Sequence, residues 1–246
     1  MRALRALSRL LHALAHAIAG WFTIMWAFPK LTQAGRDASV NVWARKMLVI
    51  LGIELRLHGT PPEHGPVLLV SNHISWLDIL VMHAARHCRF VSKSEVKHWP
   101  LLGTLATGAG TLYIERESRR DAMRVVHHMA DALRAGDILA VFPEGTTSDG
   151  LTILPFHANL VQAAISADVP AQPVALSVVD RATGSPSMGA SYIGDETLVG
   201  SVWRLLAGAP LAAVVVFGEA QRAEGRGRRV WAAQLREAVS QIRNVP

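Results

Sequence analysis

The sequence predicts an α/β protein with a mixed, largely parallel central sheet that is flanked by helices. Short β-rich apolar segments alternate with helical ones along most of the chain, and such alternation is typical of βαβ units. Polar residues follow several of the apolar segments directly, and the ends of strands are where α/β sheets place their ligands. The 246 residues suit one domain, because single cores commonly stop growing near ~250 residues. We expect this α/β domain to cover 51–246 and to follow an N-terminal helical segment over 1–50.

The first 50 residues predict helices that associate with a membrane. Three arginines in the first nine residues precede an apolar run over 10–28, which Pro29 ends. Aromatic residues occupy the place where a secretory signal has small residues for cleavage, so we interpret the segment as retained. The run is marginal against the ~20 residues needed to cross a bilayer. Its basic and aromatic ends are typical of a helix in the interface of an anionic membrane. We expect attachment to the cytoplasmic side of the inner membrane, and a buried core helix is the alternative.

The other elements follow from local patterns along the chain. Apolar segments rich in β-branched residues predict strands over 54–57, 66–70, 90–92, 111–114, 138–142, 172–178 and 212–217. Amphipathic segments predict helices over 37–50, from 76 onward, and over 101–109, 119–134, 157–167 and 230–242. The stretch 181–200 is rich in Gly, Ser and Thr and predicts loops with a short strand over 191–193. Pro170 and Pro173 suggest that the strand they lead into lies at an edge or forms a shaped wall.

Composition and charge narrow the classes of function. Half of the residues are hydrophobic and the formal net charge is +6, so an anionic partner is expected. Nucleic acid does not fit, because the chain has no zinc-finger spacing, no aromatic-rich sheet signature and no helix-turn-helix pattern. Phosphate groups and an anionic membrane surface remain as the candidate anionic partners. Cys88 is the only cysteine, which excludes an intramolecular disulfide and a cysteine metal cluster and is compatible with a reducing cytoplasm.

One short polar run predicts an acid–base pair at a strand-to-helix turn. His73 and Asp78 stand five positions apart after the apolar segment 66–70, and on one continuous helix they would point about 140° away from each other. Ser75 and Asp78 have the spacing of a capping box, which starts the helix near Trp76. His73 then stays in the loop, where the bend brings its ring within reach of the Asp78 carboxylate, as in pairs of the triad kind. A helix cap beside a polar loop histidine is the alternative interpretation of this pair alone.

Two further polar segments follow predicted strands. Lys93 follows one strand, and Arg116 follows the next at a position where its guanidinium can hold a phosphate with two parallel hydrogen bonds. Glu144, Gly145 and Thr146 follow a third strand, and the glycine lets successive N–H groups approach an anion closely. Glu144 is expected to accept a substrate hydroxyl or to orient Arg116. A surface arginine and a plain turn are the alternative interpretations.

In this order the segments resemble four sequence blocks of the glycerolipid acyltransferase family, which includes the 1-acylglycerol-3-phosphate acyltransferases. The matching stretches are 72–78 for its His-x4-Asp block, 93–116 for the second block, 142–148 for the third and 169–174 for the fourth. The resemblance implies a central sheet flanked by helices, an acyl thioester donor and a lysophospholipid or glycerol phosphate acceptor. Carried over block by block, it implies a base, His73, its partner, Asp78, and an acceptor site made of Arg116, Glu144, Gly145 and Thr146, with Lys93 as a further substrate-binding residue.

The resemblance implies O-acyl transfer in phospholipid biosynthesis. An acyl group would move from acyl-CoA or acyl carrier protein to the free hydroxyl of 1-acyl-sn-glycerol-3-phosphate, giving phosphatidic acid. Neither a cofactor nor a metal is expected, because the thioester is a co-substrate. Thr147 stands where the third block often has arginine, so one expected phosphate cation is absent, and Lys93 is a candidate to replace it. A lyso-ornithine lipid O-acyltransferase with the same chemistry is therefore the alternative.

The expected mechanism is direct transfer. His73 takes the proton from the acceptor hydroxyl while that oxygen attacks the thioester carbonyl, and backbone N–H groups hold the oxyanion. Two other classes of function stay open. A metal hydrolase is suggested by the i, i+4 pairs His83/His87 and His12/His16, although both pairs lack the glutamate of a zinc-protease motif and a third ligand. A non-catalytic membrane-binding module would use the N-terminal helix alone.

Overall fold

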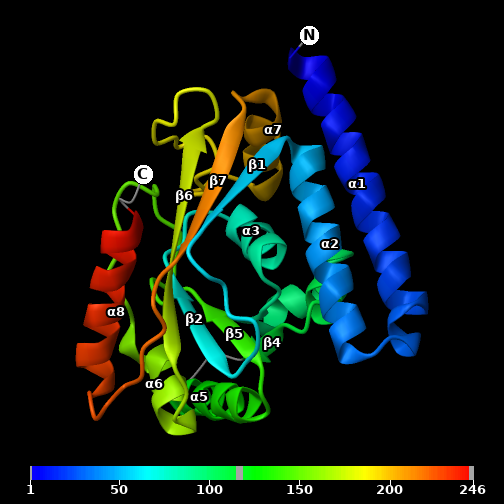
Figure 1. The fold of residues 1–246 in the computed structure, drawn as a ribbon. Coiled ribbons are helices and arrows are strands. Elements are labelled where there is room, and N and C mark those ends of the chain that lie inside the picture. The colour runs from blue at the N-terminus through cyan, green and yellow to red at the C-terminus, as the bar shows by residue number, and fades with distance from the viewer. Residues whose placement is uncertain (1, 115–118, 244–246) are drawn as a thin grey trace.

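The computed structural model describes residues 2–114 and 119–243 of the chain (Figure 1). Its strands are β1 (Ile53–His58), β2 (Val67–Ser71), β3 (Arg89–Lys93), β4 (Leu112–Ile114), β5 (Ile138–Val141), β6 (Ala171–Asp180) and β7 (Leu211–Phe217). Its helices are α1 (Arg2–Trp26), α2 (Gln33–Leu51), α3 (Leu77–Ala85), α4 (Leu102–Gly108), α5 (Arg119–Arg134), α6 (Ala158–Ala167), α7 (Leu198–Ala207) and α8 (Arg228–Arg243), with 3-10 turns at Phe28–Lys30 and Ser94–His98.

The strands of the described residues form one seven-stranded sheet in the order β1-β7-β6-β2-β5-β3-β4. Neighbouring strands from β6 to β4 pair in parallel, whereas β6 and β7 pair antiparallel and β1 follows the direction of β7. The predicted mixed, largely parallel sheet is therefore confirmed. Because β2, β3, β5 and β6 run the same way, their carboxyl ends meet at one edge of the sheet. The polar segments that follow these strands are brought to that edge.

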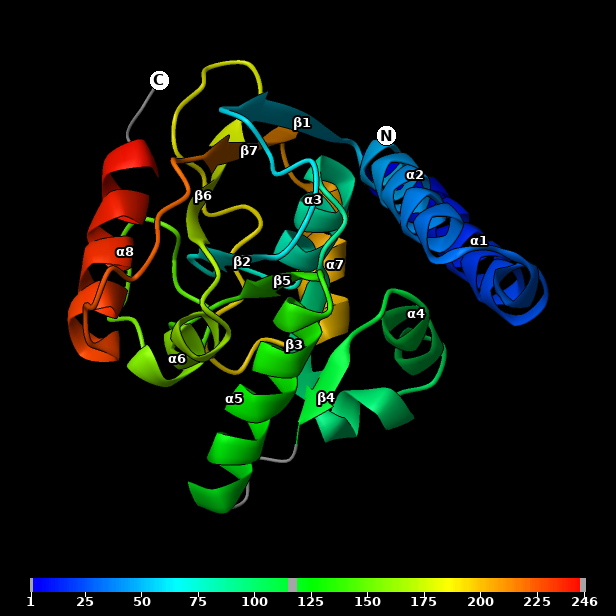
Figure 2. The same cartoon turned by 60° about the horizontal axis from the view of Figure 1, so that its bottom comes forward.

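Helices cover both faces of the sheet, as Figure 2 shows. Every residue of β2 is buried, and successive side chains of a strand point to opposite faces. Leu68 and Val70 belong to a hydrophobic cluster with α5, α6 and α8, whereas Val67 and Leu69 belong to a cluster with α2, α3 and α7. The continuous apolar run of β2 is what a strand covered on both faces requires.

The N-terminal helices pack against the α/β core. Ala6 and Ala17 of α1 and Leu48 of α2 belong to the same hydrophobic cluster as the sheet, and the side chain of Asn41 donates to the carbonyl of His83 in α3 at 2.7 Å. The opposite side of α1 exposes a stripe of apolar residues, here called the α1 stripe: Leu4, Leu7, Leu11, Leu14, Ile18, Phe22 and Met25. In the described part of the chain, no helix has the length and apolar character needed to cross a membrane. The division of the chain near residue 50 and the attachment of its first part to a membrane stay predictions.

Two local predictions are wrong. Residues 191–193 form no strand, because the backbone N–H of Tyr192 donates to the carbonyl of Ile74 and the hydroxyl of Ser191 to the carbonyl of Asp149, so these groups hold loops together. The prolines do not place β6 at an edge, since it lies between β7 and β2. Pro173 lacks a donor, but its carbonyl still accepts from Gly218 at 2.9 Å.

Candidate active site

His73 and Asp78 lie together at the turn between β2 and α3. His73 Nδ1 is 2.8 Å from Asp78 Oδ2, and the side chains are 19 % and 4 % exposed. The same oxygen accepts from the backbone N–H groups of Ile74 at 2.6 Å and Ser75 at 2.9 Å. An ionised carboxylate oxygen can accept several hydrogen bonds, so we interpret Asp78 as the acceptor from all three nitrogens. Nδ1 of His73 then carries the ring proton and donates a hydrogen bond to Asp78. Nε2 is then unprotonated and can accept a proton from a substrate.

Local hydrogen bonds explain why the chain turns here. The hydroxyl of Ser75 accepts from Leu77 N at 3.2 Å, and Asp78 reaches back to Ser75 N as described. The Asp78 contact is the one that the third residue of a capping box makes, whereas the Ser75 hydroxyl bonds to Leu77 N instead of Asp78 N. The helix begins at Leu77. The predicted turn, with His73 outside the helix and its ring over the first turn, matches this geometry.

An aromatic ring fixes the plane of the imidazole. The rings of His73 and Phe142 are stacked with their centroids 4.1 Å apart and their planes 6° apart. Phe142 follows β5, so it comes from the neighbouring strand of the same sheet edge. The face of an aromatic ring attracts a cation, so Phe142 would also stabilise an imidazolium at His73.

The segment after β5 holds the backbone of His73 on both sides. Glu144 Oε1 accepts from His73 N at 2.9 Å and its Oε2 accepts from Leu154 N at 3.1 Å. Ser148 donates to the carbonyl of His73 from its backbone N–H at 2.9 Å and from its hydroxyl at 3.1 Å. The Glu144 side chain is therefore engaged by the backbone at both oxygens, and this position favours a role in placing His73. The substrate contact predicted for Glu144 stays a prediction.

Burial raises the pKa of Glu144, and the hydrogen bonds from His73 and Leu154 oppose this effect only in part. Keeping the carboxylate ionised inside the protein therefore costs stability. Because the folded-state pKa lies above the ordinary value, this cost is absent below the pKa of the unfolded chain. It grows as the pH rises through the folded-state pKa.

Asn72 is a residue of the site that the prediction from sequence missed. Its side chain is fully buried and pairs with the backbone of Leu176 in β6, accepting from the N–H at 2.7 Å and donating to the carbonyl at 2.9 Å. The amide thus continues the β2–β6 ladder for one more residue and fixes the start of the turn that carries His73. An asparagine between the apolar run of β2 and His73 was the signal that could have indicated this role, because a polar group that close to a buried strand needs a hydrogen-bond partner.

The remaining predicted site residues lie around the same edge of the sheet. Lys93 is the last residue of β3 and is exposed, and Thr146 is exposed. Gly145 has φ +74°, and a Cβ there would meet the ring of His157 at 3.2 Å, so a glycine is required. Thr147 donates its hydroxyl to the carbonyl of Tyr192. Arg116 lies outside the described residues, so its role stays a prediction.

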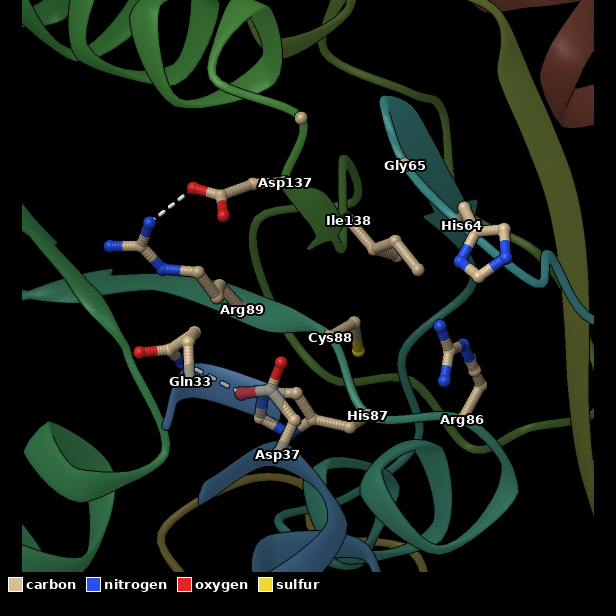
Figure 3. A pocket seen from close by; sticks show the side chains of 11 residues that line it. Gln33, Asp37, His64, Gly65, Arg86, His87, Cys88, Arg89, Asp137 and Ile138 are labelled. Carbon is tan, nitrogen blue, oxygen red and sulfur yellow. Dashed lines mark hydrogen bonds and ion pairs between the residues drawn. The ribbon is translucent and has the colours of Figure 1, made fainter. Parts of the chain in front are cut away.

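The histidines of the alternative metal site lie at the other end of the sheet. The rings of His83 and His87 are stacked, with centroids 5.1 Å apart, and burial lowers the pKa of His83 to about 3. His87 Nε2 is 3.2 Å from Asp37 Oδ1, beside a cavity of about 250 Å³ that also has Arg86 and Arg89 in its wall (Figure 3). Among the described residues, no group of three His, Cys, Asp or Glu side chains could hold a metal ion. The expectation that the active site works without a metal stays a prediction.

Comparison with known proteins decides the family. The sequence profile of the acyltransferase family matches residues 53–177, from β1 into β6, and this stretch contains His73, Asp78 and the segment after β5. The protein belongs to the acyltransferase family. The resemblance found in the four sequence blocks is thereby confirmed.

Relatives of this acyltransferase share most of its length. The lyso-ornithine lipid O-acyltransferase of Pseudomonas aeruginosa is 36% identical over 92% of this chain and 87% of its own. The 1-acyl-sn-glycerol-3-phosphate acyltransferase of Neisseria meningitidis is also 36% identical, over 84% of this chain and 81% of its own. The two names differ in the acceptor lipid and agree in the transfer of an acyl group.

A solved structure has the fold of this acyltransferase. The crystal structure of the 1-acyl-sn-glycerophosphate acyltransferase of Thermotoga maritima superposes with a TM-score of 0.71, covering 98% of this chain and 94% of the other, at 17% identity. The shared fold includes the N-terminal helices and the helices after β6, which lie outside the stretch 53–177 that the family profile matches.

Proposed function

We propose that the protein transfers an acyl group from an acyl thioester to the free hydroxyl of 1-acyl-sn-glycerol-3-phosphate, forming phosphatidic acid. The observation that carries this proposal is the contact between His73 Nδ1 and Asp78, which leaves Nε2 at the sheet edge as a base. Family membership and the Neisseria relative support the choice of reaction and acceptor. Acyl-CoA and acyl carrier protein are both candidate donors, and the thioester is a co-substrate, so the proposal includes no cofactor.

In the proposed reaction, His73 Nε2 takes the proton from the acceptor hydroxyl as the hydroxyl oxygen bonds to the thioester carbonyl carbon. The carbon–sulfur bond then breaks, and the departing thiolate takes the proton from His73. Asp78 holds the imidazolium formed between these steps. Direct transfer is preferred over an acyl-enzyme because the Ser75 hydroxyl is engaged by Leu77 N and Cys88 is buried with a raised pKa.

Lyso-ornithine lipid is the second candidate acceptor. Thr147 occupies the position where an arginine could hold a phosphate, and its hydroxyl is bound to the carbonyl of Tyr192. A lyso-ornithine lipid carries no phosphate and does not need that cation. The Pseudomonas relative, named for this acceptor, favours the same alternative.

A transfer assay tests the proposal. Purified protein is incubated with labelled acyl-CoA or labelled acyl carrier protein and with lysophosphatidate, lyso-ornithine lipid or lysophosphatidylcholine, and the labelled products are separated. We expect phosphatidic acid as the main product and no product in the absence of acceptor. Exclusive labelling of lyso-ornithine lipid would replace the acceptor and keep the chemistry. Free fatty acid as the main product would instead indicate a hydrolase.

Arg116→Ala should weaken binding of the acceptor more than binding of the donor. The predicted guanidinium–phosphate contact is charge-assisted and bidentate, so its loss should raise KM for lysophosphatidate by about tenfold or more. KM for the thioester should change by less than about twofold. The kinetics of both substrates are measured against Arg228→Ala, which removes an exposed arginine of α8. Equal increases for the two substrates would contradict a phosphate role for Arg116.

We also propose that the α1 stripe lies in the interface of an anionic membrane on the cytoplasmic side. The stripe exposes apolar side chains along the whole helix, with leucines in its first half, and arginines flank its first turns, which is the pattern of an interfacial helix. A lysolipid acceptor resides in such a membrane, so attachment would bring the site at the sheet edge near its substrate.

Replacing Leu7, Leu11 and Leu14 together by serine should weaken binding to vesicles by at least ~10-fold, because each buried leucine contributes ~1.5 kcal/mol or more. Co-sedimentation with phosphatidylglycerol-containing vesicles measures the effect. The control variant carries Met123→Ser and Val230→Ser, which remove exposed apolar residues of α5 and α8. Equal binding of the two variants would rule out the stripe as the attachment surface.

A further inference from the structure

Two arginines of α8 bind the loop that follows the third polar segment. Arg236 Nη2 donates to the carbonyl of Ile153 at 2.6 Å, and its Nε lies 3.2 Å from that carbonyl and 3.1 Å from the carbonyl of Leu154. Two turns further along the same face of the helix, Arg243 donates to the carbonyls of Gly150 at 3.3 Å and Leu151 at 2.8 Å. The two guanidinium groups thus bind the carbonyls of residues 150, 151, 153 and 154 in one loop.

This loop is the one that holds the backbone of His73. The peptide that follows Ile153 presents Leu154 N to Glu144 Oε2, and the other oxygen of Glu144 accepts from His73 N. Arg236 is therefore connected to His73 through a short series of hydrogen bonds. The series runs from Arg236 to the peptide of residues 153 and 154, from that peptide to the Glu144 carboxylate, and from Glu144 to the backbone of His73.

The loop depends on these side chains because it lacks the regular backbone hydrogen bonds of a helix or a sheet. Residues 142–157 form neither helix nor strand, so their carbonyl groups need partners from elsewhere. Ile153 packs with Val239 of α8 in a small hydrophobic cluster, which seats the loop on the same helix. Backbone position in such a segment is set by side chains that reach it, and a planar guanidinium can bond two carbonyls at once.

We infer that Arg236 is a positioning residue for the base: it holds the peptide of residues 153 and 154, and through Glu144 it sets the position of His73. Arg236 lies outside the stretch 53–177 that the family profile matches. The inference rests on the proposed role of His73. Arg243 supports the same loop farther from Glu144, so its removal should have the smaller effect.

The test measures turnover of Arg236→Gln, Arg236→Lys and the control Arg229→Gln, which alters an exposed arginine of the same helix. Glutamine is too short to reach the two carbonyls. We expect kcat of Arg236→Gln to fall about tenfold, since small displacements of a catalytic group reduce rates strongly. KM for both substrates should stay within about twofold. Lysine keeps the reach and the charge but lacks the planar guanidinium that bonds two carbonyls at once. The kcat of Arg236→Lys should therefore lie between those of Arg236→Gln and the unaltered protein. Arg229→Gln should behave as the unaltered protein.

A double-mutant cycle with Glu144→Gln separates positioning from general damage to the structure. Glutamine at 144 retains one acceptor oxygen for two N–H groups, so it breaks the series of hydrogen bonds between the loop and His73. If Arg236 acts through Glu144, Arg236→Gln should lower kcat by less than about threefold in the Glu144→Gln background, because coupled residues are non-additive. The ring signals of His73 in NMR spectra should also shift in Arg236→Gln and stay in place in Arg229→Gln.

Turnover of Arg236→Gln within twofold of the unaltered protein would overturn the inference, and so would an equal loss in both backgrounds of the cycle. Circular dichroism and thermal unfolding confirm that each variant is folded. If Arg236→Gln does not fold, Arg236→Lys replaces it in the cycle with the same criteria. His73→Ala is measured in parallel: high activity in that variant refutes the proposed base, whereas an inactive His73→Ala beside a fully active Arg236→Gln refutes only the inference.

Discussion

His73→Ala is expected to lower kcat by ~10² to 10⁴-fold, the usual contribution of a general base. The variant keeps the backbone contacts of residue 73 with Glu144 and Ser148 and removes only the ring. KM for lysophosphatidate and for the thioester should therefore change little. The loss should appear in turnover because the ring acts on the proton that moves during the reaction.

Single-turnover transfer of a labelled acyl group measures this effect, and thermal unfolding shows that the fold is retained. His127→Ala is the matched control, because it removes an exposed histidine from α5 on the other side of the sheet. Near-normal turnover of His73→Ala, or an equal loss in His127→Ala, would refute the assignment of His73 as the base.

Asp78→Asn is expected to lower kcat by ~10² to 10⁴-fold while preserving the shape of the site. The remaining oxygen of the amide must serve Ile74 N and Ser75 N, which now bond to Oδ2 of Asp78. The amide NH2 group is then left facing His73 Nδ1 and favours the tautomer with its proton on Nε2. Such a ring donates where the reaction needs an acceptor, and the charge that stabilises the imidazolium is lost.

Asp78→Ala distinguishes the effect on catalysis from the effect on stability. Alanine leaves Ile74 N and Ser75 N without their acceptor in a buried turn, and each unsatisfied donor costs ~1 to 3 kcal/mol. We expect Asp78→Ala to unfold at lower denaturant concentration than Asp78→Asn, with a similar loss of turnover. Asp131→Asn, which changes a surface carboxylate of α5, is the control. Full turnover of folded Asp78→Asn would mean that Asp78 only caps the helix.

Local features could be predicted from the sequence because their causes are local. The helix over 119–134 and the strands around it follow from patterns within a few residues, and their bounds agree with the structure to within one residue. The contact of His73 with Asp78 also depends on one turn of chain, with Ser75 starting the helix. The spacing therefore predicted the contact of the two side chains, but it left open whether they are a base and its acid or a loop histidine beside a helix cap.

Contacts between distant segments could not be predicted in the same way. The contact of the Glu144 carboxylate with the backbone of His73 was not predicted, because it follows from the register of β2 and β5. Asn72 pairs with Leu176 only because β6 lies beside β2. The loop at 191–193 has a strand-like composition, and its backbone groups bond to residues 74 and 149 instead. Pattern rules contain no information on which distant carbonyl or N–H a side chain meets.

His73 is far in sequence from the groups that hold it, and this separation affects the order in which the site forms while the protein is being synthesised. A nascent chain that has left the ribosome as far as α3 already contains His73, Asp78 and the N-terminal helices. It still lacks Glu144, the partner strand with Leu176, and Arg236 of α8, which are made later. Contacts of such long range form late, because the intervening chain must first be closed into loops. With the proposed roles of the α1 stripe and of Arg236, the chain would be able to reach a membrane surface well before His73 is held in place, and acyl transfer would begin only after α8 has docked.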